Sequence, residues 1–213
     1  MKLVRLLVVC SAAAMLPAAM AQKWEFGMGA GGSFYTPQDV TLGSTSASAK
    51  FKTGVAVSTW VGNNMTDRWG GELRYTYGMG DAQLKQGSAE AVFGAESHTV
   101  NYDFLWHARP SESSVRPFLA GGAGIKFFRG TGTEAISQPL SQYALLTKAG
   151  DVTGVVSVGA GVKMKLGAHA WLRLDVHDYM GPFPKQVITP NVGANVEGWM
   201  HDIVPMVAIS FGQ

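Results

Sequence analysis

The chain has little cysteine, little charge and no long hydrophobic run beyond its first 21 residues. Cys10 is the only cysteine among 213 residues, so no disulfide framework can stabilise the fold. Charged residues make up 15% of the chain, against a typical ~25%, and hydrophobic residues make up 46%. This balance excludes an intrinsically disordered chain and a coiled coil. Basic residues number 17 and acidic residues 15, so we expect no nucleic acid as a partner.

The first 21 residues have the pattern of a secretory signal peptide. Two basic residues precede an apolar stretch at residues 6–16, and residues 19–21 (AMA) fit a small-x-small cleavage site. A membrane-anchor helix is the alternative, but this stretch is shorter than the ~20 residues that a span requires. We therefore predict cleavage between Ala21 and Gln22. Cleavage would remove Cys10 and leave equal numbers of basic and acidic residues.

The rest of the chain is dominated by alternation of apolar and polar residues, the period of a β-strand. Four segments alternate clearly, and these are residues 23–35, 69–79, 97–107 and 169–179. Four others alternate less regularly, and these are residues 51–62, 116–128, 153–166 and 199–212. No stretch of 18 consecutive apolar residues occurs among them, so no membrane-spanning helix is expected. The pattern predicts an all-β fold of eight strands.

The connections between these predicted strands alternate strictly between long and short. The long ones are residues 36–50, 80–96, 129–152 and 180–198, and the short ones are residues 63–68, 108–115 and 167–168. This alternation is typical of an outer-membrane barrel, with long loops outside and short turns in the periplasm. Strands of ~11 residues tilted by ~40° rise about 28 Å, enough for a ~25 Å apolar band. We predict an eight-stranded antiparallel up-and-down transmembrane β-barrel over residues 22–213.

The size of the residues on each strand face indicates which face meets lipid. Eight strands leave an interior just wide enough for side chains to fill, so the large apolar residues cannot all point inward. Turning them outward places glycine, small polar and charged residues inside, and the sheet must close because hydrocarbon cannot satisfy backbone groups. Aromatic residues expected at the membrane interfaces are Trp24, Trp69, Trp106, Tyr75, Tyr77 and Phe211.

Two tryptophans do not fit this division. Trp60 and Trp171 alternate in phase with residues expected inside the barrel. Either a bulge turns them outward or they plug the periplasmic mouth, and we favour a plug for Trp171.

Charged residues on the inward face predict an ion-pair network. A buried charge is costly unless it is paired and hydrogen-bonded, and both signs occur here in near balance. A gated polar channel is the alternative, but a structural network fits a narrow interior better. The predicted members are Glu25, Glu72, Arg74, Asp103, Lys163, Arg173, Asp175 and His177. Lys52 and Lys126 lie near or on less regular strands and are further candidates.

No catalytic, metal or cofactor site is predicted. The five histidines form no His-x-His or His-x3-His pair, so no metal-ligand set is indicated. A lipid-acting hydrolase could use His177 and Asp175 with a loop serine such as Ser137 or Ser141, but no Gly-x-Ser-x-Gly motif is present. The glycine clusters lack the strand-to-helix context of a phosphate-binding loop.

The strand motifs resemble the small outer-membrane β-barrel family, the OmpA- and OmpX-like eight-stranded domains. The matching pieces are residues 100–107 (VNYDFLWH), 116–124 (RPFLAGGAG), 159–163 (GAGVK) and 172–179 (LRLDVHDY). The resemblance implies a protein of the bacterial outer membrane whose partners are the lipid bilayer and the barrel-assembly machinery. Members usually end in an aromatic residue that this machinery recognises, whereas here Phe211 is followed by Gly212 and Gln213.

Function is expected to lie in the long loops. Loops 129–152 and 180–198 contain apolar residues, namely Leu140, Tyr143, Leu145, Leu146, Phe183 and Ile188. These residues would either contact an extracellular ligand or lipid headgroups, or form a lid over the interior. The sequence favours a non-enzymatic structural or surface-interaction barrel. A narrow pore or carrier for small solutes and a lipid-acting membrane enzyme are the alternatives.

Overall fold

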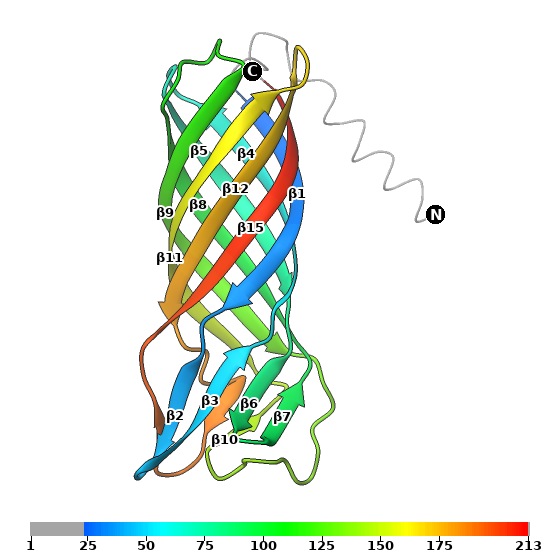
Figure 1. Cartoon of the computed structure of the whole chain (residues 1–213), viewed down its shortest axis with the longest axis vertical. Coiled ribbons are helices and arrows are strands. Elements are labelled where there is room, and N and C mark those ends of the chain that lie inside the picture. The colour runs from blue at the N-terminus through cyan, green and yellow to red at the C-terminus, as the bar shows by residue number, and fades with distance from the viewer. Residues whose placement is uncertain (1–23, 213) are drawn as a thin grey trace, which may run out of the picture.

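The computed structural model describes residues 24–212 and shows a closed antiparallel barrel with a cap of shorter strands at one end (Figure 1). Each barrel strand pairs with the next one along the chain, and the first pairs with the last. The strands are β1 (Trp24–Tyr35), β4 (Gly54–Asn64), β5 (Trp69–Met79), β8 (Ala95–His107), β9 (Val115–Gly130), β11 (Gly150–Lys165), β12 (Ala170–Pro182) and β15 (Trp199–Gly212). The predicted eight-stranded up-and-down barrel is confirmed. The predicted signal peptide and its cleavage between Ala21 and Gln22 lie outside the described residues.

The four long connections are present, and each of them contains strands that the sequence pattern did not predict. Five of these strands form one sheet in the order β14-β2-β3-β6-β7, and two form a separate ribbon. The sheet contains β2 (Gln38–Leu42), β3 (Thr45–Phe51), β6 (Ala82–Gln86), β7 (Ala89–Phe93) and β14 (Ala194–Val196). The ribbon pairs β10 (Ala144–Leu146) with β13 (Ile188–Pro190). We call this assembly the cap, and the barrel end with the short connections the turn end.

Two tight turns build the hairpins of the cap. Leu42 pairs with Thr45 and Gln86 pairs with Ala89, so each hairpin turns within two residues. The first turn residue is Gly43 or Gly87, with φ of 60° and 58°. Glycine adopts such angles without steric cost, which explains a glycine at the start of each two-residue turn.

The cap has its own hydrophobic core. Its buried members come from every long connection and from the ends of the barrel strands, and they include Val40, Ala49, Phe51, Leu84, Phe93, Phe128, Tyr143, Leu146, Val187 and Met200. Of the loop residues singled out from the sequence, Leu140, Tyr143, Leu146, Phe183 and Ile188 are buried in this core, and Leu145 is 41% exposed. These side chains therefore cover the barrel mouth from within the cap.

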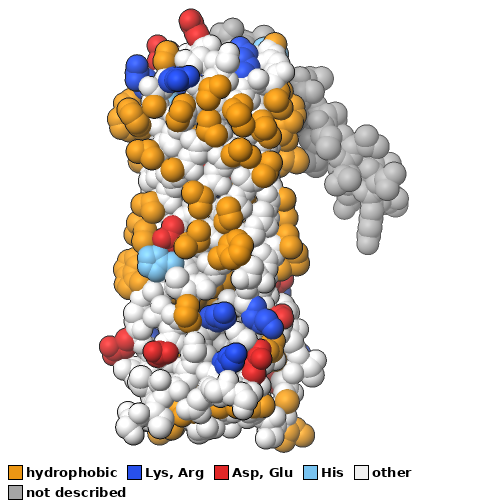
Figure 2. All heavy atoms as spheres, viewed as in Figure 1, with side chains coloured by type: hydrophobic (Ala, Val, Ile, Leu, Met, Phe, Trp, Pro, Cys, Tyr) orange, Lys and Arg blue, Asp and Glu red, His pale blue; other side chains and the backbone are white. Residues whose placement is uncertain are grey.

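The outer wall of the barrel is apolar. Outward positions carry large hydrophobic side chains, including Met28, Leu73, Phe104, Leu119, Val158, Leu174 and Val207. On the face shown in Figure 2, hydrophobic side chains are spread over the wall of the barrel, while most lysines, arginines and acidic residues lie above and below this region. No helix among residues 24–212 is long and apolar enough to cross a membrane.

Candidate functional site: the barrel interior

All eight charged or titratable residues predicted on the inward face are buried in the barrel. Their exposed fractions do not exceed 7%, and they are Glu25, Glu72, Arg74, Asp103, Lys163, Arg173, Asp175 and His177. The alternation of strand side chains places them there, because residues two apart share a face. The closed sheet separates them from the lipid-facing wall.

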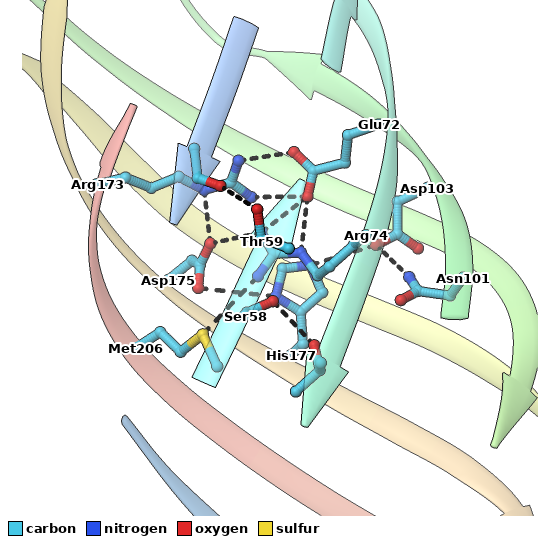
Figure 3. A network of polar contacts seen from close by, with 12 residues as sticks. Ser58, Thr59, Glu72, Arg74, Asn101, Asp103, Arg173, Asp175, His177 and Met206 are labelled. Carbon is cyan, nitrogen blue, oxygen red and sulfur yellow. Dashed lines mark hydrogen bonds and ion pairs between the residues drawn. The ribbon is translucent and has the colours of Figure 1, made fainter. Parts of the chain in front are cut away.

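Four of these residues form a cluster across the middle of the barrel (Figure 3). A guanidinium nitrogen of Arg74 lies 2.7 Å from Glu72 Oε1 and 3.1 Å from Asp175 Oδ2. Arg173 donates from Nη1 to Glu72 Oε2 at 2.7 Å and from Nε to Asp175 Oδ2 at 2.5 Å. The strands β5 and β12 that carry these residues are four apart in the ring of eight, so they lie on opposite walls. The cluster therefore bridges the full width of the interior.

Trp60 packs inside this cluster. The centroid of its ring lies 4.5 Å from the guanidinium carbon of Arg74 and 4.6 Å from the guanidinium carbon of Arg173. The guanidinium carbon of Arg173 also lies 4.4 Å from the ring centroid of Phe118. Trp60 and Trp171 are each 2% exposed, so both point inward and no bulge turns them toward lipid. These distances are those of cation–π contacts, and the rings fill space between the ion pairs.

Two further ion pairs cross the barrel on either side of the central cluster. Toward the turn end, Lys163 Nζ lies 2.6 Å from Glu25 Oε2. Toward the cap, Lys126 pairs with Asp202, which also accepts a hydrogen bond from the Ser33 hydroxyl. Each pair joins strands three apart in the ring. The interior therefore holds three successive levels of ionic bridges.

Three buried titratable residues of this interior, Asp202, Arg116 and His107, were not predicted from the sequence, and one predicted candidate lies elsewhere. Asp202 is on the polar face of the last strand, a signal that could have identified it. Arg116 lies on a glycine-rich strand of ambiguous phase; it is buried and donates to the Asp67 carbonyl at 3.1 Å. Lys52 is not in the interior, because its side chain is 44% exposed in the cap and lies 3.8 Å from Glu90.

Asp103 and His177 form a less tightly bonded part of the interior. Asn101 donates to Asp103 Oδ2 at 2.8 Å, and His177 Nε2 lies 3.4 Å from the same oxygen. Glu72, Asp103 and His177 bring one potential metal ligand each within 4.8 Å of one another. Both oxygens of Glu72 already accept hydrogen bonds from Arg173, at 2.7 and 3.2 Å, so the arrangement does not fit a metal ion.

The predicted interface aromatics all lie on the outer wall. Trp69, Phe211, Tyr75 and Trp106 are 38–52% exposed, and Trp24 and Tyr77 are partly buried. Trp69 and Trp106 are directly opposite each other on β5 and β8, near the turn end. The Tyr75 hydroxyl lies 2.8 Å from His98 Nδ1 nearer to the cap. The outer wall thus has aromatic side chains toward both ends of the barrel.

The charges in the interior balance. Among residues 24–212, the buried basic side chains are Arg74, Arg116, Lys126, Lys163 and Arg173, and the buried acidic ones are Glu25, Glu72, Asp103, Asp175 and Asp202. Equal numbers of the two signs, most of them held in ion pairs, are what a buried ionic interior requires. The arrangement stabilises charges against one another inside the barrel.

The family model described as "outer membrane protein beta-barrel domain" matches residues 6–181. The crystal structure of Neisserial surface protein A is similar over 88% of this chain and 97% of its own, at 10% identity and a TM-score of 0.52. The outer membrane protein OprG from Pseudomonas aeruginosa is similar over 89% and 96%, at 14% identity and a TM-score of 0.53. No curated protein sequence matches the chain. At these identities the structural likeness shows the fold alone.

Proposed function

Because this chain belongs to the family of outer membrane protein β-barrel domains, we propose that it acts there as a non-enzymatic structural or surface-interaction barrel with a closed interior. It is a bacterial outer-membrane protein, and its apolar wall lies in the lipid bilayer. We further propose that residues 1–21 are a cleaved signal peptide and that the barrel-assembly machinery inserts the chain. The short turns would then face the periplasm and the cap would face outward.

The closed interior is supported by the ionic bridges that cross it. The cluster of Glu72, Arg74, Arg173 and Asp175 joins opposite walls, and each of its members is nearly inaccessible to solvent. An open pore would need charged groups facing water, whereas these groups face one another. The titratable groups of this cluster are occupied by ion pairing, which favours a structural role over a catalytic one.

The cap adds a second closure. Phe51 and Phe128 stack with ring centroids 5.0 Å apart, and both belong to the hydrophobic core above the barrel. Hydrated ions would have to cross this apolar layer after the ionic layers. A narrow pore for small polar solutes is therefore the weaker proposal.

Single-channel recording in planar bilayers tests the closed interior. We expect no steady openings from the wild-type barrel. A double variant, Trp60→Ala with Arg173→Ala, removes two of the largest interior side chains and should produce openings, provided that a heat-dependent gel shift shows that it still folds. Steady wild-type openings that Arg74→Ala abolishes would establish the pore instead. Lipid profiles from cells with and without the protein test the enzymatic alternative.

We propose that loops 129–152 and 180–198 contact an extracellular ligand through the exposed tips of the cap. Most of their apolar residues are buried, but Ile136 and Val192 are almost fully exposed. Exposed apolar side chains on a rigid support commonly mark a contact surface. Replacing both with Ser should abolish binding of whole cells to their target surface without changing the gel shift of the barrel, and unchanged binding would contradict this role.

A further inference from the structure

A cavity of about 560 Å³ lies on the outer wall of the barrel near the cap, away from the ionic interior. Its lining comes from β8, β9, β11 and the residues that precede β11. His98, Phe127 and Val152 form its apolar and aromatic part, and Arg129 and Lys148 its basic part. The cavity is open to the side of the barrel, where lipid packs.

The boundary between apolar and polar wall passes through this cavity. His98 pairs with Phe127 across β8 and β9, and Phe127 pairs with Val152 across β9 and β11. One step nearer to the cap, Arg129 is the next outward residue on β9, and it pairs with Gly150 and Glu96. On β8 and β9 the outward residues therefore become charged at the same height, and next to Gly150 the chain reaches Lys148, a change that is typical of the level of lipid headgroups.

The acidic groups near the cavity are already engaged. Asp151 accepts hydrogen bonds from the backbone N–H of Val152 at 2.8 Å and from that of Gln186 at 2.9 Å. Glu96 accepts a hydrogen bond from the Tyr77 hydroxyl at 3.0 Å. These donors are neutral, so both carboxylates keep their charge, but Asp151 alternates with the outward residues Gly150 and Val152 and therefore lies on the opposite face of β11 from the apolar wall.

The basic groups are accessible. The Arg129 side chain is 71% exposed and approaches Glu96 only to 4.0 Å. Lys148 is exposed, and within residues 24–212 no carboxylate lies within 4.0 Å of its ammonium group. An arginine and a lysine above an apolar wall complement a ligand with a phosphate above an acyl chain.

We propose that this cavity binds one phosphorylated lipid of the outer leaflet. Arg129 and Lys148 hold its phosphate, His98 donates a hydrogen bond to the headgroup, and an acyl chain lies against Phe127 and Val152. The site anchors the barrel to a specific anionic lipid, a property distinct from the closed interior and from any ligand of the cap.

The binding is tested with full-length processed protein in neutral detergent, titrated with dimyristoyl phosphatidic acid and followed by native mass spectrometry. Each cation near a membrane surface contributes about 1 kcal/mol, so losing both corresponds to about thirtyfold weaker binding. We expect this loss for Arg129→Gln with Lys148→Gln. The matched control is Lys50→Gln with Lys85→Gln, which removes two lysines from the five-stranded sheet of the cap and should leave binding unchanged.

Two further titrations identify the source of the phosphate. Dimyristoyl phosphatidylcholine and inorganic phosphate should each bind the wild-type protein much more weakly than phosphatidic acid. Equal binding of phosphatidic acid by both double variants, or equal affinity for inorganic phosphate, would overturn the proposal. The heat-dependent gel shift shows independently that each variant is folded, so a negative result here leaves the closed interior untouched.

Discussion

The central ionic cluster makes a quantitative prediction about stability. Arg173 is completely buried and donates three hydrogen bonds, two to Glu72 and one to Asp175. Arg173→Met keeps an unbranched side chain, although a shorter one, and removes the charge, so Arg74 alone remains to neutralise two carboxylates. Breaking a buried ion pair in this way typically costs ~3–5 kcal/mol. We expect a loss of that size in the free energy of unfolding.

The measurement is a urea titration of the barrel in phospholipid vesicles, followed by tryptophan fluorescence. A double-mutant cycle separates lost pairing from lost packing. Adding Glu72→Gln to Arg173→Met removes the unpaired charge, so the double variant should be more stable than the sum of the single losses predicts. Arg109→Met at an exposed position of the turn end is the control and should stay within ~0.5 kcal/mol. A loss below ~1 kcal/mol, or strict additivity, would refute a dry, coupled cluster.

Three further substitutions test the wall, the cap core and the cap turns. Leu174→Arg on the outward face of β12 should destabilise the barrel in vesicles by ~2–4 kcal/mol, and an unchanged urea midpoint would contradict the assignment of that face to lipid. Leu84→Ala in the cap core should cost ~2–5 kcal/mol locally, exposing the cap to trypsin while the gel shift of the barrel persists. Gly87→Val, at φ of 58°, should strain the turn and slow refolding of the cap, as followed with an antibody specific for the folded cap. Ser88→Val, at the neighbouring position, should have a smaller effect.

The barrel was predictable from the sequence because the alternation of side chains along each strand can be seen without knowing which strands pair. Each wall strand must alternate between lipid and interior, so the period-2 pattern places Leu73 outside and Glu72 inside without knowledge of any partner. The same pattern placed Trp60 with the inward residues, and its size suggested a conflict. The structure resolves the conflict, because two guanidinium groups stack on the ring and make it part of the ionic interior.

The pairing inside the barrel was not predictable, because it depends on how the strands are staggered around the ring. Glu25 and Lys163 are 138 residues apart in sequence and meet only when the sheet closes. The cap was missed for a different reason. Its strands are three to seven residues long, too short for alternation to be distinctive, although Gly43-Ser44 and Gly87-Ser88 are two-residue turn signals.

The order of strands in the cap sheet has a consequence for biogenesis. β14, from the last long connection, pairs with β2, from the first, and the other strands come from between them. The sheet therefore cannot be completed until the first and last hairpins have both delivered their polar tips to the same side of the membrane. With the cap facing outward, as proposed, those tips have to cross the membrane before the sheet can form, so an antibody specific for the finished cap would report that insertion has ended.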